Sequence, residues 1–239
     1  ETELETVADS HRVETLLQRL ARLLGVNELH LLFNYRALSA TATAGDTTLT
    51  RVVGIGSMGV DMRVESALGR YLKSLDECPL LDELEDQLRT IARSAAPYPR
   101  WFVVVFVGLA CGAFCLLFGA DIQAAARAGI GAAAGLCLKF LLASHAPNAV
   151  LLTTLCAALS SLLAALPVPG VGNSPDLGLA MTASVLYLVP GVPMINALED
   201  MLQGHVNIAM GRAVSAMLLC MAIALGLIFS LTALGATPS

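Results

Sequence analysis

Hydrophobic and polar positions follow two different patterns along the chain. Up to about residue 97, short apolar groups recur at helix or strand spacing among many charged residues. After residue 101, long uncharged stretches alternate with short polar segments, and each stretch approaches the roughly 20 apolar residues that a helix needs to cross a bilayer. The pattern predicts an N-terminal cytoplasmic α+β domain over residues 1–97 and a membrane α-helical domain over residues 98–239.

The N-terminal part is predicted to place helices around a small sheet. An apolar face at three- and four-residue spacing predicts a helix over Val7–Leu24, which Gly25 would end. Gly45-Asp46 predicts a hairpin turn between two strands. The strands are expected at Leu29–Phe33, Leu38–Ala42 and Thr47–Val53, and two further helices at Asp61–Leu75 and Pro79–Ser94.

The apolar half predicts five membrane-spanning helices. Its entry is the segment Tyr98-Pro99-Arg100-Trp101, where the proline ends the preceding helix and the aromatic rings suit the headgroup layer. The fourth apolar stretch is interrupted by Pro190-Gly191-Val192-Pro193. Backbone groups freed there must be buried in protein or line a wet cavity, unless the prolines only kink the helix or end it near the cytoplasm. The expected spans are about 101–119, 122–144, 149–166, 177–198 and 213–234.

Composition agrees with a membrane protein. Hydrophobic residues make up 56% of the chain and charged residues only 14%, against about a quarter in soluble domains. The net charge of −5 and the lack of a basic cluster argue against nucleic acid as a partner. After Trp101 the only charged residues are Asp121, Arg127, Lys139, Asp176, Glu199, Asp200 and Arg212.

These few charges predict the orientation in the membrane. Arg100 places the start of the first span in the cytoplasm, and Lys139 and His145 mark the inner end of the second. The loop 167–176 lacks Lys and Arg and is expected outside. The segment 199–212 is then a cytoplasmic loop and the C-terminus is periplasmic. The polar, acidic start of the chain lacks the apolar segment of a signal peptide, so the N-terminal domain is expected to stay in the cytoplasm.

Several features resemble catalytic or cofactor motifs without their full context. Gly54, Gly56 and Gly59 form a G-x-G-x-x-G between a predicted strand and a predicted helix, as in dinucleotide-binding proteins. That fold also requires a following parallel strand that ends in an acidic residue, and the sequence offers another helix instead. A glycine turn is the preferred interpretation. The scattered histidines match no catalytic spacing, so we expect no enzyme and no cofactor.

Five of the six cysteines lie in apolar runs. Cys111 and Cys115 are one helical turn apart, which is a spacing compatible with a metal or redox pair. No His, Asp or second pair accompanies them at ligand spacing, so packing is the preferred interpretation and no metal is expected.

The broken fourth span and the cations of the second span carry the candidate chemistry. Secondary transporters bind substrate at discontinuous helices, and a cation deep in a bilayer costs several kcal/mol and therefore usually marks a pathway. Arg127 is expected to snorkel to the outer face, whereas Lys139 is the better candidate for meeting an anion. The expected substrate-binding or translocation residues are Lys139, Ser184, Pro190, Gly191, Pro193 and Asn196.

The end of the fourth span is a candidate for coupling to an ion. Glu199 and Asp200 follow the span directly and precede His205, so this segment either relays protons or coordinates a cation, or it is an ordinary solvated loop. Two G-x-x-x-G pairs in the first two spans permit close helix contact, and packing is their expected role. These glycines are Gly108, Gly112, Gly131 and Gly135.

Two parts of the membrane half contain distinctive residue patterns. The first part is Tyr98-Pro99-Arg100-Trp101 with Val107-Gly108-Leu109, Cys111 and Phe114-Cys115. The second is Ala183-Ser184-Val185-Leu186, Leu188-Val189-Pro190-Gly191, Pro193, Ile195-Asn196-Ala197, Asp200, Gly204-His205, Asn207 and Arg212. Both parts resemble the threonine/serine exporter family of bacterial inner-membrane proteins. The resemblance extends over nearly the whole chain and is strongest from residue 97 to about 212.

The resemblance implies an exporter. In one branch of the family the protein acts with a smaller, YjjB-like membrane partner and the pair is associated with succinate export, whereas single-chain relatives export threonine and serine. An odd number of spans would invert an appended related half, which is a common transporter plan. We therefore expect a subunit of a larger hetero-oligomer that exports small carboxylates, with succinate first. Amino-acid export is the near alternative, and a membrane anchor or assembly subunit with a regulatory soluble domain is the alternative from another class.

Overall fold

The computed structural model describes residues 10–23, 25–34, 37–45, 47–54, 66–67, 69–71, 86–91, 98–144, 148–167 and 175–235. They belong to two compact units. The N-terminal unit combines residues up to 97 with residues 192–214, and the helical unit combines residues 98–191 with residues 215–239. The contacts thus group residues 192–214 with the N-terminal part of the chain, across the domain boundary expected at residue 97.

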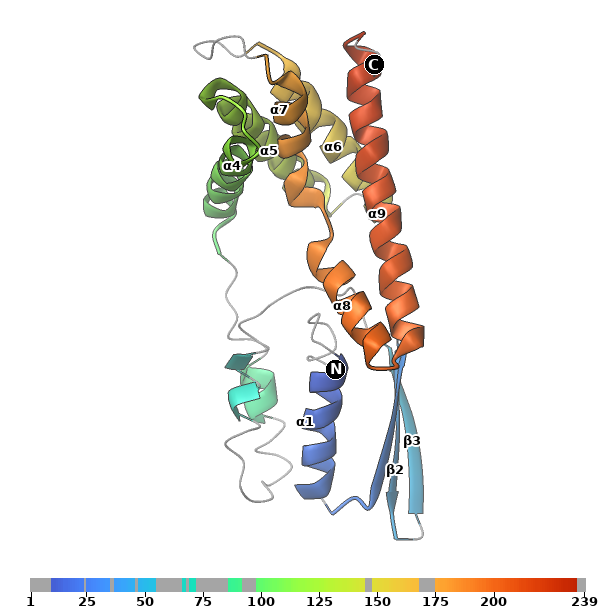
Figure 1. Cartoon of the computed structure of the whole chain (residues 1–239). Coiled ribbons are helices and arrows are strands. Elements are labelled where there is room, and N and C mark those ends of the chain that lie inside the picture. The colour runs from blue at the N-terminus through green and yellow to red at the C-terminus, as the bar shows by residue number, and fades with distance from the viewer. Residues whose placement is uncertain are drawn as a thin grey trace. The chain divides into compact units, whose positions relative to one another are not determined.

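The three predicted strands are confirmed. They form an antiparallel sheet in the order β1-β2-β3 (Figure 1). Ala44 pairs with Thr47, and Gly45 adopts a φ of 58° that favours glycine, so the second hairpin turns where the sequence predicts. The bounds are β1 Glu28–Asn34, β2 Ala37–Ala44 and β3 Thr47–Gly54.

The sheet offers no support for the dinucleotide-binding alternative. Gly54 ends β3 and pairs with Ala37 in an antiparallel register, whereas the dinucleotide fingerprint follows a strand of a parallel sheet. Gly56 and Gly59 lie outside the described residues. The predicted helices over 61–75 and 79–94 fall mostly outside them too, with helical residues described at 66–67, 69–71 and 86–91.

The core of the N-terminal unit contains residues from distant parts of the sequence. Helix α1 (Ser10–Leu23) packs against β1, and Gly25 follows it with a φ of 74°, which confirms the predicted stop. Phe33 and Leu38 of the sheet are buried against Ile208, with Leu17 and Leu31 beside them. Ile208 belongs to α9 (Val206–Ala233), so a residue far along the sequence completes this core.

The helical unit is built of apolar helices. Helix α5 packs between α4 and α6, and α7 contacts all three (Figure 1). A short 3₁₀ turn, η1, follows α7, and the chain breaks at Val189-Pro190 before α8 begins. The bounds are α4 Arg100–Leu117, α5 Ile122–Leu142, α6 Ala149–Ala165, α7 Leu177–Ser184, η1 Leu186–Leu188 and α8 Gly191–Leu202.

Helices α4, α5 and α9 are long and apolar enough to cross a membrane. The segments Leu177–Leu188 and Gly191–Leu202 together form a fourth, broken candidate, as the prolines predict. Helix α6 is apolar but has only 17 residues. Many large apolar side chains, such as Leu109, Leu117 and Phe229, are exposed, as expected of surfaces that face lipid. The prediction that all five segments span the membrane stays a prediction.

Small residues bring the helix backbones together. A Cβ atom added to Gly108 would lie 2.9 Å from the carbonyl oxygen of Gly129, and one added to Gly112 would lie 2.9 Å from that of Ala125. On the other side of α5, a Cβ at Gly131 would overlap the carbonyl oxygen of Ser160. Both faces of α5 therefore contact a neighbouring helix at backbone distance.

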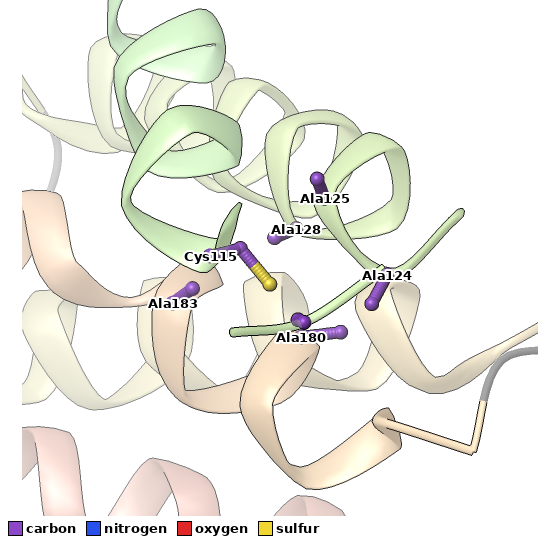
Figure 2. Close-up of a cluster of buried hydrophobic side chains, with 7 residues drawn as sticks. Cys115, Ala124, Ala125, Ala128, Ala180 and Ala183 are labelled. Atoms are coloured by element: carbon purple, nitrogen blue, oxygen red, sulfur yellow. The ribbon is translucent and has the colours of Figure 1, made fainter. Parts of the chain in front are cut away.

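A cluster of alanines continues this close packing where α4, α5 and α7 meet (Figure 2). The Cys115 side chain points into the cluster and is fully buried, and Cys111 of the same helix is 3% exposed. The cluster consists of Cys115, Ala120, Ala124, Ala125, Ala128, Ala180 and Ala183. The structure thus places Cys115 among apolar side chains.

The expected bounds of the loop over residues 199–212 are wrong, whereas its position on the cytoplasmic side stays a prediction. Helix α8 continues to Leu202, and α9 begins at Val206, seven residues before the predicted start of the last span. The physical reason is Gly204, whose φ of 87° lets the chain reverse direction within three residues. The His205 amide donates to the Asp200 carbonyl at 2.8 Å, which closes this helix end.

The packing predicts a loss of stability for one glycine substitution and little effect for another. Gly131→Ala is expected to destabilise the protein by about 1–3 kcal/mol, because the added methyl would overlap the α6 backbone. Gly178→Ala in α7 is the matched control, since nothing lies within 4 Å of its added Cβ atom. Thermal unfolding in detergent measures both, and a Gly131→Ala protein as stable as the control would contradict the close contact.

Candidate functional site

A buried ion pair links α8 and α9 at their turn. Asp200 is fully buried, Arg212 is 5% exposed, and the Arg212 guanidinium donates through Nη1 to Oδ2 of Asp200. The short turn at Gly204 makes this possible, because it sets the start of α9 against the end of α8. Sequence analysis selected Asp200 as a coupling residue and did not assign Arg212 a role.

The carboxylate of Asp200 retains capacity for a further interaction. Its second oxygen, Oδ1, is buried and accepts no hydrogen bond from any residue that the structure describes. Asn196 lies one turn earlier on the same helix face and is also buried. A buried carboxylate oxygen with a spare lone pair is able to accept a proton or contact a small cation, and both reactions neutralise part of a charge held away from water.

His205 connects this turn to the N-terminal α+β elements. Its Nε2 atom lies 3.3 Å from a carboxylate oxygen of Glu14 on α1, and both side chains are partly buried. Its ring meets Phe33 of β1 edge-on, with 5.5 Å between the centroids. One turn of α9 further on, Ile208 inserts into the core around Phe33. The N-terminal unit thus holds the end of α8 and the start of α9 through polar and apolar contacts.

The remaining predicted residues have different surroundings. Glu199 is exposed, unlike its neighbour Asp200, because consecutive residues face different sides of a helix. Pro190 is buried at the break, whereas Gly191 is exposed and Pro193 is intermediate. Ser184 is fully buried, and its hydroxyl donates to the Met181 carbonyl at 2.7 Å.

The predicted residues fall into both compact units. Lys139 of α5 is half-buried and belongs to the helical unit together with Ser184, Pro190 and Gly191. Pro193, Asn196, Glu199, Asp200 and His205 belong to the N-terminal unit. Within that unit the fold unites Asn196, Asp200 and His205 around one turn and leaves Glu199 outside the group.

Arg127 corrects one expectation. Its side chain is only 3% exposed, on the buried face of α5 with Ala124 and Ala128, so it does not snorkel to the headgroup layer. Sequence alone could not show this, because Arg127 lies near enough to the helix end for either outcome.

Two pairs of hydroxyls inside the helical unit were missed. Ser160 of α6 and Tyr187 of η1 share a hydrogen bond of 3.2 Å, and Ser161 and Ser230 lie 2.6 Å apart on α6 and α9. The partners are 27 and 69 residues apart in sequence, so no spacing relates them. The only available signal was the presence of polar residues within otherwise apolar runs.

Comparison with known proteins relates this chain to one family. A family model described as "Putative threonine/serine exporter" (ThrE) matches residues 4–234. A relative from Escherichia coli (strain K12), named "Probable succinate transporter subunit YjjP", is 33% identical over 236 residues, which cover 97% of this chain and 90% of the relative. The protein of the same name from Klebsiella aerogenes is 30% identical over 234 residues, with the same shares. No solved structure matches the chain.

The buried ion pair predicts a large effect of Arg212. Arg212→Ala would leave the Asp200 carboxylate buried without its cation and is expected to destabilise the protein by about 3–5 kcal/mol. Glu199→Gln, at the exposed neighbouring position, should change stability by less than about 0.5 kcal/mol.

Thermal unfolding in detergent compares the two variants. Asp200→Asn combined with Arg212→Ala tests the cause, because removing both charges should restore part of the stability lost by Arg212→Ala alone. If the Arg212→Ala variant unfolds at the same temperature as the wild type, the ion pair does not stabilise the protein.

Proposed function

The chain belongs to the threonine/serine exporter family, and we propose that it is a subunit of a bacterial inner-membrane exporter of small carboxylates, succinate first. The observation that carries this proposal is the similarity, over nearly the full length of the chain, to two relatives that are named succinate transporter subunits. Threonine/serine export remains the near alternative, because the family as a whole carries that description.

The chemistry of the apolar half is compatible with an anionic substrate. Lys139 supplies a cation in α5, and the positive end of the α8 dipole follows the break at Pro190. In the proposed pathway Lys139, Ser184, Pro190, Gly191, Pro193 and Asn196 contact the substrate. Succinate and amino acids both carry a carboxylate. These residues therefore favour succinate only if they also recognise its second negative charge.

We assign ion coupling to the turn between α8 and α9. Asp200 is the central residue of this proposal, because it is fully buried and its Oδ1 atom accepts no hydrogen bond from the described residues. His205 would act through its backbone bond to Asp200 and its contact with Glu14. Glu199 is exposed and would serve as an entry point for the ion or proton.

The proposed assembly pairs this chain with a smaller, YjjB-like membrane subunit. Both relatives carry the word subunit in their names, which supports a partner. Five spans, with the N-terminal domain in the cytoplasm and the C-terminus in the periplasm, make half of an inverted-repeat plan that a related partner would complete. We expect several such pairs in a larger hetero-oligomer.

Counterflow in liposomes tests the substrate. Liposomes that contain this chain and the YjjB-like subunit, loaded with unlabelled succinate, are expected to accumulate labelled succinate faster than labelled threonine. The same liposomes with this chain alone should show little flux, because the pathway would be incomplete. Faster threonine counterflow would replace succinate by the amino-acid alternative, and full activity of the chain alone would refute the need for a partner.

Single substitutions separate a transport subunit from a membrane anchor. Lys139→Gln, Asn196→Ala and Asp200→Asn are each expected to lower counterflow roughly tenfold or more, since each removes a group proposed to contact substrate or ion. Gly178→Ala is the control. If all three variants assemble with the partner and transport at the wild-type rate, the chain is an anchor or assembly subunit instead.

A further inference from the structure

The hydroxyl pair Ser160–Tyr187 lies where several helices of the helical unit meet. Ser160 comes from α6 and is fully buried, and Tyr187 comes from η1, two residues before the break that starts at Val189. The thiol of Cys111 on α4 is hydrogen-bonded to the backbone of Tyr187. The pair therefore lies at the broken helix, with Ser160 buried and Tyr187 partly exposed.

This pair uses only part of its hydrogen-bonding capacity. The two hydroxyls supply two donors, and the 3.2 Å bond between Oγ and Oη uses one of them. Neither hydroxyl makes another hydrogen bond to the residues that the structure describes. One donor is thus left without an acceptor among the described residues, and because Tyr187 is partly exposed, this donor is available to a ligand.

The second hydroxyl pair, Ser161 and Ser230, has an acceptor for each of its donors. Ser161 and Ser230 are 2.6 Å apart, and each also lies within hydrogen-bonding distance of a helix carbonyl, 2.8 Å to Ala157 and 2.9 Å to Ala158. All of their donors have acceptors, which is the arrangement expected of hydroxyls that only join two helices. The Ser160–Tyr187 pair lacks these additional bonds.

Gly135 makes the site possible. A Cβ atom at this position would overlap Oγ of Ser160 and lie 2.5 Å from Oη of Tyr187, so only glycine lets both hydroxyls approach α5. Lys139 follows Gly135 by four residues and therefore lies on the same side of α5, about 6 Å further along the axis. The carbonyl oxygen of Cys156 on α6 lies 3.1 Å from the same Cβ position.

These groups favour a negatively charged ligand. The site combines a spare hydroxyl donor with the cation of Lys139, which lies about one helical turn from Gly135 on α5.

We propose that Tyr187 and Ser160 bind one carboxylate of a short dicarboxylate and that Lys139 binds the other. The separation of one helical turn is comparable to the distance between the terminal oxygens of a four-carbon dicarboxylate. An amino acid would instead bring its ammonium group toward Lys139, where like charges repel. The inference rests on the proposed export function and names the residues that select succinate.

The test compares succinate with its monoamide, succinamate, which keeps one carboxylate and replaces the other by a neutral amide. Both compounds compete with labelled succinate in liposomes that contain this chain and its YjjB-like partner. Tyr187→Phe and Ser160→Ala should raise the half-saturating concentration of both compounds roughly tenfold, since each variant removes a hydroxyl from a charged acceptor. Lys139→Gln should weaken succinate alone and thereby abolish the preference for succinate over succinamate.

Two controls separate binding from folding. Lys139→Arg keeps the cation and should retain the preference for the dicarboxylate. Ser161→Ala removes a hydroxyl of the satisfied pair and should lower thermal stability without changing the preference. A Tyr187→Phe complex with wild-type half-saturation, or a Lys139→Gln complex that still prefers succinate, overturns the site while the proposed function stands. A wild-type complex inert toward succinate overturns both.

Discussion

The close approach of helix backbones through small residues is the constraint on which the rest of the helical unit depends. Lipid tails are as apolar as Leu side chains, so helices associate in a bilayer by contact and hydrogen bonding more than by burial from water. Helix α5 contacts α4 at Gly108 and Gly112 and contacts α6 at Gly131 and Gly135. A larger residue at Gly135 would push Ser160 and Tyr187 away, so packing and the proposed substrate site share one requirement.

The turn between α8 and α9 obeys a different constraint, the need to compensate buried charge. Asp200 is fully buried and has Arg212 beside it, because desolvating either ion alone would cost several kcal/mol. The turn also supplies Ile208 to the core of the N-terminal unit and His205 to Glu14. The α+β elements are therefore folded against the segment that follows the broken helix.

Prediction from sequence succeeded where a local signal was strong. Alternating residues and Gly45 predicted the strands, uncharged apolar runs predicted the membrane helices, and Pro190 and Pro193 predicted the broken span. It failed where two outcomes share one local pattern. The polar segment from Glu199 to Arg212 resembles a loop, yet it continues two helices, because Gly204 turns the chain sharply and Arg212 neutralises Asp200.

The sequence by itself determined the membrane character and the family, because these depend on hydropathy and residue order summed over long segments. Only the tertiary structure decided which polar residues meet. Ser160 and Tyr187 are separated by 27 residues, and Asp200 and Arg212 by 12. Such pairs depend on the rotation of each helix about its axis and on the room left by glycines of a third helix, and both quantities are set by packing between segments distant in sequence.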